Sequence, residues 1–111
     1  MQNSLHTESS LCPRFHRAVE LIGRRWTGAI IRVLMPGARR FNELLAAVPG
    51  ISDRLLTERL RELESAGIIR REVQAGSPVR VRYELTRSGF ELREALDAVG
   101  RWAELWLPAG D

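Results

Sequence analysis

The chain has 111 residues, which is enough for one domain with a single hydrophobic core and too few for two independent domains. Hydrophobic residues make up 44% and charged residues 28% of the sequence, so the composition excludes a chain held unfolded by its own charge. No apolar run approaches the roughly 20 residues of a membrane-spanning helix, and the polar start MQNSLHTESS lacks the apolar centre of a signal peptide. We therefore expect a cytoplasmic protein without membrane contact.

The predicted domain covers residues 11–107, between a flexible tail over 1–10 and a short tail over 108–111. Cys12, near the start of this domain, is the only cysteine of the chain and cannot form an internal disulfide. A lone thiol agrees with a reducing compartment and is free for either packing or chemistry.

All 17 Lys+Arg residues of the chain are Arg, and the net charge is +3. Arginine makes bidentate contacts to phosphate and guanine that lysine does not, so this composition favours a nucleic-acid partner. A genome-wide bias against lysine codons explains the same composition equally well. The positions of the arginines therefore have to decide between the two explanations.

Two core helices are predicted at the start of the domain. In CPRFHRAVELIG, Pro13 suits a first helical position, and apolar residues recur at helical spacing. The segment RRWTGAIIRVLMPG repeats that spacing and stops at the Pro-Gly pair. Trp26 falls on the apolar stripe of this second helix, so we expect it in the core.

The next segments predict two helices joined by a tight turn. ARRFNELLAAV opens with a short extended stretch over 39–41 and continues as a brief helix, which a Pro-Gly pair ends. Ser52 then follows, and its side chain can cap the free amides of a second helix, with Asp53 in the first turn. This helix is expected to run to about Ala66, with Gly67 as its end signal.

The second helix of this pair has two distinct faces when its residues are placed at about 100° intervals. One face is a stripe of leucines: Leu55, Leu56, Leu60 and Leu63. The opposite face is polar: Arg54, Thr57, Glu58, Arg61 and Ser65. Arg59 lies near the edge of the stripe, where we expect it to rest on the core or to pair with an acid. The polar face also fits an exposed ladder of ion pairs around Glu58, which is a purely structural role.

From Ile68 onward the apolar period changes to two. IIRREV predicts a strand, QAGSP a loop and VRVRYEL a second strand with an apolar face of Val79, Val81, Tyr83 and Leu85. Two strands alone are unstable in water, so this hairpin is expected to pack its apolar face on the helices. Thr86 then caps one long helix, RSGFELREALDAVGRWAELW, whose apolar stripe comprises Leu92, Leu96, Val99, Ala103 and Trp106, with Trp102 beside it.

These elements predict a mainly α fold with a small β-hairpin, in the layout of a winged helix-turn-helix with additional N- and C-terminal helices. Such proteins place the N-terminal half of their second helix against base edges in the major groove of DNA. The residues predicted to contact DNA from this helix are Ser52, Arg54, Thr57 and Arg61. Arg80 and Arg82 of the hairpin would reach the adjacent backbone or minor groove, and Arg39 and Arg40 would contact phosphates.

Several motifs together resemble the HxlR-type bacterial transcription regulators, within the wider MarR-like winged-helix group. The resemblance extends from Cys12 to Trp106 through CP, ELIGRRWT, RRFNELLAAVPGIS, LTERLRELESAGIIRR, YELTRSG and the Trp-bearing last helix. Family members usually carry Lys in a GGKWT motif, where this chain has Gly23-Arg24-Arg25, a change that conserves the charge. The resemblance implies a homodimer that binds dyad-symmetric operator DNA, with repression as the commoner outcome and the 74–80 loop as the wing.

An obligate homodimer is expected to form mainly through the last helix, with help from the first helix, because a domain this small needs little of that long apolar stripe for its own core. The predicted interface residues are Leu92, Leu96, Val99, Trp102 and Trp106. Cys12 is a candidate redox sensor, because a helix start and the neighbouring Arg14 both favour the reactive thiolate. The resemblance points the same way, since some HxlR-type regulators sense oxidants or electrophiles through an N-terminal cysteine. The alternative for Cys12 is a small packing residue.

An enzyme is disfavoured, because Cys12 has no evident base beside it and no metal-ligand spacing or Gly-rich phosphate loop appears. No catalytic residue, metal or cofactor is therefore predicted, and the expected partners are operator DNA, a second copy of the chain and a small-molecule or oxidant effector. The main rival is a winged-helix module that binds protein instead of DNA, because fold alone does not fix function. Basic residues on both the polar helix face and the hairpin argue against this rival.

Overall fold

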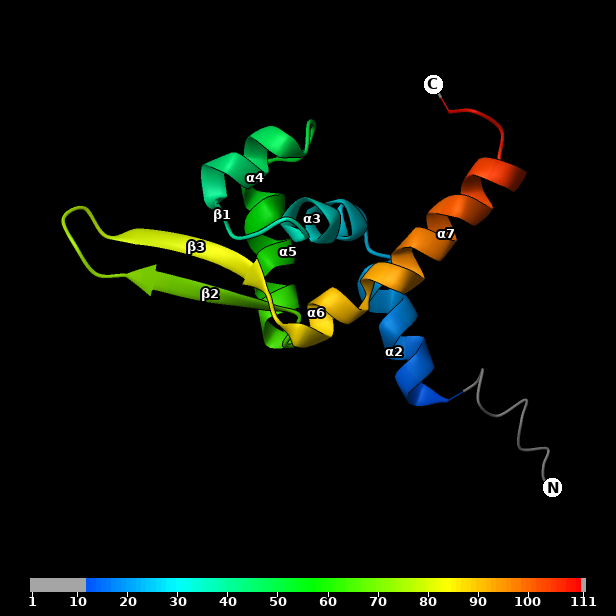
Figure 1. Cartoon of the computed structure of the whole chain (residues 1–111), viewed down its shortest axis with the longest axis horizontal. Coiled ribbons are helices and arrows are strands. Elements are labelled where there is room, and N and C mark those ends of the chain that lie inside the picture. Colours follow the sequence, from blue (N-terminus) through cyan, green and yellow to red (C-terminus); the bar gives the residue numbers. More distant parts are fainter. Residues whose placement is uncertain (1–11, 111) are drawn as a thin grey trace.

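The computed structural model describes residues 12–110, so the predicted tail over 1–10 lies outside the described residues. The elements follow one another as α2 (Pro13–Ile22), α3 (Thr27–Leu34), β1 (Arg39–Arg40), α4 (Phe41–Ala47), α5 (Asp53–Ser65), β2 (Ile69–Gln74), β3 (Arg80–Leu85), α6 (Arg87–Glu91) and α7 (Arg93–Trp106) (Figure 1). The predicted mainly α fold with a β-hairpin is confirmed. The helix-turn-helix is α4–α5, and the hairpin β2–β3 follows it as the wing.

The hydrophobic core lies between α3, α4, α5 and the inner end of the hairpin. Its buried side chains are Ile30, Ile31, Leu34, Leu44, Val48, Ile51, Leu56, Leu60, Leu63, Ile68, Ile69 and Leu85. The leucine stripe of α5 supplies three of these residues, and Leu55 packs against them half-buried. The stripe prediction for α5 is therefore confirmed, and the opposite face of the helix is left for solvent or a partner.

The local signals at the start and end of α5 act as the sequence predicts. The Ser52 hydroxyl oxygen accepts a hydrogen bond from the Leu55 amide at 3.1 Å, and Asp53 occupies the first turn. At the other end, Gly67 has a left-handed backbone with φ of +75°. Only glycine adopts that conformation without steric strain, so the helix stops there and the chain turns into β2.

The sheet has three strands in the order β1–β3–β2, one strand more than the hairpin predicted from sequence. Arg39 pairs with Tyr83 and Arg40 with Arg82, which attaches the start of α4 to the edge of the wing. The predicted extended stretch over 39–41 is too short to indicate a strand by itself. Residues 39 and 40 form a strand only because β3, much later in the sequence, supplies their hydrogen-bonding partners.

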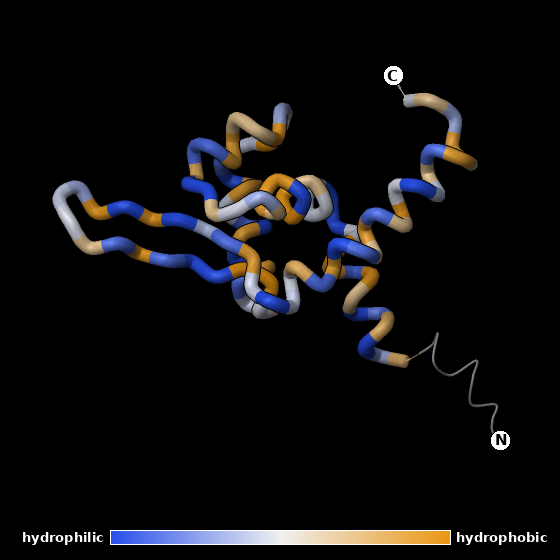
Figure 2. Tube along the Cα trace, in the orientation of Figure 1, coloured by the Kyte–Doolittle hydropathy of each residue, from blue (hydrophilic) through white to orange (hydrophobic). Residues whose placement is uncertain are grey.

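The wing packs on the helices only at its base, which corrects the expectation for its apolar face. Ile69 and Leu85 are cross-strand partners and are buried, whereas Val73 is 52% and Val79 60% exposed. Figure 2 shows the hairpin protruding from the helices with hydrophobic and hydrophilic residues alternating to its tip. No helix covers the outer half of the wing in the part of the chain that the structure describes, so this half is available to a partner.

The predicted long C-terminal helix is divided into α6 and α7, with Leu92 at the junction. The Thr86 hydroxyl caps α6 as predicted, accepting from the Gly89 amide at 3.4 Å. Gly89 is buried so closely against the Ile68 carbonyl and the Leu85 side chain that no side chain fits there. α6 is therefore held against the base of the sheet, while α7 departs in a new direction (Figure 1).

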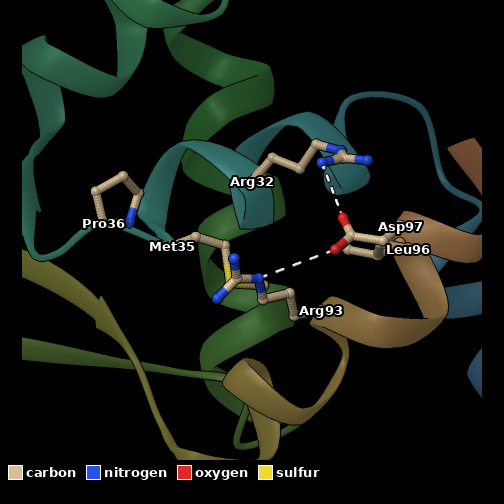
Figure 3. A pocket seen from close by; sticks show the side chains of 6 residues that line it. All are labelled: Arg32, Met35, Pro36, Arg93, Leu96 and Asp97. Carbon is tan, nitrogen blue, oxygen red and sulfur yellow. Dashed lines mark hydrogen bonds and ion pairs between the residues drawn. The ribbon is translucent and has the colours of Figure 1, made fainter.

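α7 is connected to the core through α3. Asp97 accepts a hydrogen bond from Arg32 of α3 at 3.2 Å and lies 3.9 Å from Arg93, at a pocket also lined by Met35, Pro36 and Leu96 (Figure 3). Neither α2 nor α7 contains a fully buried residue. The radius of gyration is 16.5 Å, against about 13 Å for a compact chain of this length.

Trp26 packs against the core, as predicted, but is only half-buried. It precedes α3 with a left-handed backbone, φ +79°, and is half-buried against Gly50, with the Arg25 guanidinium 4.7 Å from its ring centre. Trp26 lies in the connection between α2 and α3, and its indole packs against the edge of the core.

Candidate nucleic-acid interface

The two basic side chains on the polar face of α5, Arg54 and Arg61, differ in their ion pairing. The Arg54 side chain is 90% exposed and its Nε lies 3.5 Å from Glu58, whereas Arg61 is exposed with no acidic partner within the described residues. Thr57 donates its hydroxyl proton to the Asp53 carbonyl at 2.9 Å, which leaves the oxygen free to accept. The sequence also allowed a ladder of ion pairs in which Glu58 contacts both Arg54 and Arg61. Among the described residues only the pair between Arg54 and Glu58 is present.

An exposed ion pair of this kind contributes about 0.2 to 1 kcal/mol, so it is easily exchanged for another partner. Arg54 and Arg61 are therefore both available to a ligand. Ser52 is different, because its side chain already caps the helix. It lies exposed at the N-terminal end of the same face, where a ligand would meet the first turn of α5.

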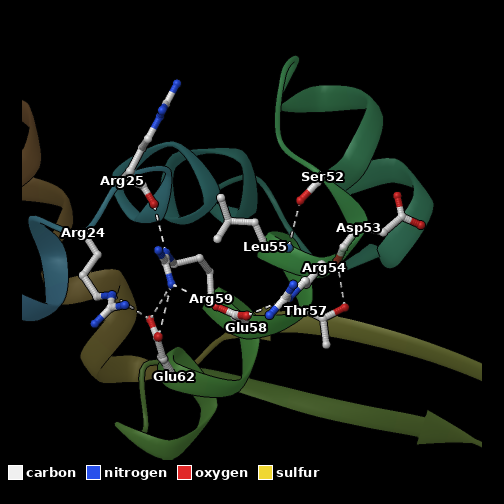
Figure 4. A network of polar contacts seen from close by, with 10 residues as sticks. All are labelled: Arg24, Arg25, Ser52, Asp53, Arg54, Leu55, Thr57, Glu58, Arg59 and Glu62. Carbon is white, nitrogen blue, oxygen red and sulfur yellow. Dashed lines mark hydrogen bonds and ion pairs between the residues drawn. The ribbon is translucent and has the colours of Figure 1, made fainter.

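The opposite side of α5 is fixed by Arg59, as the sequence predicts. Its side chain is 9% exposed, its Nε donates to the Arg25 carbonyl at 3.0 Å, and its Nη1 lies 3.2 Å from Glu62. Glu62 in turn pairs with Arg24 at 3.3 Å. Figure 4 shows these contacts joining α5 to the connection between α2 and α3. The helix that carries Arg54, Thr57 and Arg61 is therefore held in a defined orientation.

In the wing, the two predicted arginines have unequal freedom. Arg80 is exposed beside the tip, opposite Gln74. Arg82 lies nearer the base and pairs with Glu72 at 3.1 Å, and its buried Nε has no hydrogen-bond partner among residues 12–110. Arg82 is thus already engaged within the sheet, and Arg80 is the better placed of the two for a contact with DNA.

On β1, Arg40 is exposed and Arg39 half-buried, and the two side chains point to opposite faces of the sheet. The backbone amide of Arg40, the N-cap residue of α4, donates a hydrogen bond to the Glu43 carboxylate at 2.8 Å, and this contact caps the start of the helix. A basic residue that the sequence analysis did not select, Arg71 of β2, lies with Thr57 and Arg61 around one hollow. Its position on the apolar face between Ile69 and Val73 is the signal that could have identified it.

Cys12 is the N-cap residue of α2 and is half-buried, ahead of Pro13 at the first helical position. Hydrogen bonding from the Phe15 backbone amide lowers the pKa of the Cys12 thiol; partial desolvation opposes this, and the Arg14 amide with the cations of Arg14 and Arg17 adds to the lowering. The thiolate is thus favoured at the place where the sequence predicts it.

The predicted interface residues of the last helix fall into two groups. Leu92 and Leu96 are half-buried against the core of their own chain. Val99, Trp102 and Trp106 are 61%, 55% and 72% exposed. Phe15 and Val19 of α2 add further exposed apolar surface. Within residues 12–110, no cluster of His, Cys, Asp and Glu is placed to hold a metal ion, and no helix is long and apolar enough to cross a membrane.

Comparison with known proteins identifies the family. The HxlR-like helix-turn-helix family model matches residues 21–111. The chain belongs to this family. HxlR-like proteins are transcription regulators that bind DNA through a winged helix-turn-helix, and the function predicted from sequence is thereby confirmed at that level.

Two relatives from Bacillus subtilis match over most of the chain. The HTH-type transcriptional regulator YvaP is 42% identical over 90% of this chain and 93% of its own length. The reduced form of the transcriptional regulator YodB is 42% identical, covers 90% of this chain and 98% of its own, and superposes with a TM-score of 0.82. YodB structures have also been solved after diamide treatment and with bound quinone. The reduced redox regulator HypR is 37% identical over 80% of this chain and 88% of its own, with a TM-score of 0.75.

Proposed function

We propose that this HxlR-like regulator binds dyad-symmetric operator DNA as a homodimer and represses transcription from it. The proposal rests on two features that occur together. Helix α5 has a polar face that carries Arg54, Thr57 and Arg61, and a basic wing protrudes from the fold. A major groove about 12 Å wide admits one helix, and the wing is then directed toward the neighbouring minor groove.

The side chains on α5 read base edges, and those on the wing contact the backbone. Replacing Arg54, Thr57 or Arg61 by Ala should change which sequence is preferred, because each base contact carries about 1 to 3 kcal/mol of discrimination. Replacing Arg80 by Ala should weaken binding to all sequences evenly and lower the slope of log affinity against log salt by about 1. If specificity survives loss of all three α5 side chains, α5 is not the reading element.

A second copy covers the outer half of α7. Val99, Trp102 and Trp106 of α7 and Phe15 and Val19 of α2 are large apolar side chains left exposed in the single chain, and a second copy that covers them would remove them from water. Two-fold symmetry about this surface would present the two α5 helices about 34 to 36 Å apart, one turn of DNA.

The experiment that tests the whole proposal is selection of bound duplexes from a random pool by the purified protein. A palindromic motif with half-sites one helical turn apart is the expected result. A pool without any motif, or no binding to duplex DNA at low salt, would favour the rival module that binds protein.

Cys12 is proposed as the sensor of oxidants or electrophiles. Its lowered pKa and position at the start of α2 support this role, and YodB has been solved in reduced, diamide-treated and quinone-bound forms. A peroxide would oxidise the Cys12 thiolate to a sulfenic acid, which then condenses with a second thiol, the mate's Cys12 or a small thiol, to give a disulfide and water. Diamide would join the same two thiols in a disulfide and be reduced to the hydrazine, and a quinone would add to the thiolate as a thioether. DNA affinity should change after diamide in the wild type and not in Cys12→Ser. A response that survives in the Ser variant would leave Cys12 as a packing residue.

A further inference from the structure

Arg71 of β2 stands on the side of the wing that faces α5. It is the cross-strand partner of Tyr83, which in turn pairs with Arg39 of β1. Side chains alternate along a strand, so Arg71 shares its face with Ile69, which is buried in the core. Arg71 therefore places a positive charge on the inner face of the wing, next to the buried apolar residues at its base.

The neighbouring arginines on the opposite face of the sheet are already neutralised. Arg70 lies 3.2 Å from Glu84, and Arg82 lies 3.1 Å from Glu72. Arg71, by contrast, is exposed and makes no ion pair or side-chain hydrogen bond among residues 12–110. A guanidinium that is exposed and has no partner among the described residues is free to bind an external anion with its fork of donors.

Arg71 lies at a hollow between α5 and the wing, with a volume of about 280 Å³. Thr57, Leu60, Arg61 and Glu64 line it from the helix, and Arg71 and Tyr83 from the sheet. Glu64 brings one negative charge, which the guanidinium groups of Arg61 and Arg71 outweigh. The hollow is thus a net cationic recess at the junction of the two elements that are directed at DNA.

A protein with a helix in the major groove and a wing in the adjacent minor groove straddles the sugar-phosphate strand that separates the two grooves. In this fold the space between α5 and the wing is the hollow lined by Arg61 and Arg71. We propose that Arg71 binds a phosphate of that strand through its guanidinium fork. The inference rests on the proposed function and adds to it a positioning residue that fixes the register of α5 on the duplex without reading sequence.

The test compares Arg71→Gln with Arg70→Gln, which removes the same charge from the adjacent residue on the opposite face. Affinity is measured for the selected operator and for a random duplex across a range of salt concentrations. Arg71→Gln should lose about tenfold on both duplexes and lower the salt slope by about 1, since a charged hydrogen bond contributes roughly 1.5 kcal/mol. Arg70→Gln should stay within about twofold of the wild type, as expected for a residue away from the duplex. Melting curves confirm that both variants fold.

A second measurement locates the contact by replacing operator phosphates one at a time with neutral methylphosphonates. Arg70→Gln and the wild type should lose affinity at one position flanking the base contacts, and Arg71→Gln should lose nothing further there. Unchanged affinity in Arg71→Gln, or a changed sequence preference, overturns the phosphate assignment while the wild type still binds its operator. Absence of operator binding by the wild type would instead overturn the proposed function itself.

Discussion

Replacing Arg59 by Met should destabilise the fold by about 2 kcal/mol, because a charged hydrogen bond is lost and the Arg25 carbonyl loses its donor. The Arg59 side chain is 9% exposed, and its Nε donates to that carbonyl at 3.0 Å. The ion pair with Glu62 adds less, since Glu62 is 32% exposed and keeps Arg24 as a partner at 3.3 Å. Methionine retains the apolar stem, so the measured loss reports the polar contacts.

A loss of this size lowers the melting temperature of a domain of about 100 residues by roughly 10 °C. The matched control is Arg54→Met on the same helix, where the lost pair is 90% exposed on the arginine side and the expected change is below about 0.5 kcal/mol. Both variants are melted at one protein concentration, because dimer formation makes the melting temperature depend on concentration. Equal melting temperatures for the two variants would refute the argument from burial.

Three further changes test other parts of the structure. Val99→Asp should yield a monomer by light scattering at micromolar concentration, because Val99 is 61% exposed in the single chain and a charge there opposes burial in a dimer; a dimer of unchanged stability would place the interface elsewhere. Gly89→Ala should destabilise by about 1 to 3 kcal/mol through a clash with a backbone carbonyl, whereas Gly28→Ala, with open space around it, should stabilise α3 by up to about 1 kcal/mol in denaturant titration. Alkylation of Cys12 should persist to lower pH than alkylation of free cysteine, because the pKa of its thiol is lowered and the thiolate is lost only as pH falls through that lower value. In Arg14→Gln the pH dependence of alkylation should move only partly back toward that of free cysteine, because the Phe15 backbone amide is the larger cause of the lowered pKa.

The sequence predicted those features whose causes lie within one element. The cap at Ser52, the leucine stripe of α5 and the inward position of Arg59 follow from helical geometry and the chemistry of single side chains, and all three are present. Helices α2 and α3 were predictable for the same reason. The boundary at Gly67 was equally local, because it depends on the backbone preference of one residue.

The features that sequence reasoning missed depend on contacts between distant segments. β1 is two residues long and exists as a strand only through its pairing with β3. The break at Leu92 arises because α6 is anchored on the sheet through Gly89 and α7 on α3 through Asp97. Neither anchor has a signature in the local apolar period, which continues across the junction.

The arrangement of the arginines bears on the question that composition left open. Codon bias accounts for the use of arginine in place of lysine, but it does not select which arginines lack an acidic partner. Arg70 and Arg82 on the outer face of the wing form ion pairs with acidic residues, and so does Arg59 on the side of α5 that faces the rest of the protein. Arg61 and Arg71, which face each other across the hollow, are unpaired within the described residues. Unpaired arginines also occur elsewhere on the surface, so pairing alone does not decide the question. The convergence of Arg61 and Arg71 from two elements on one hollow concentrates positive charge there, and this favours a polyanionic partner.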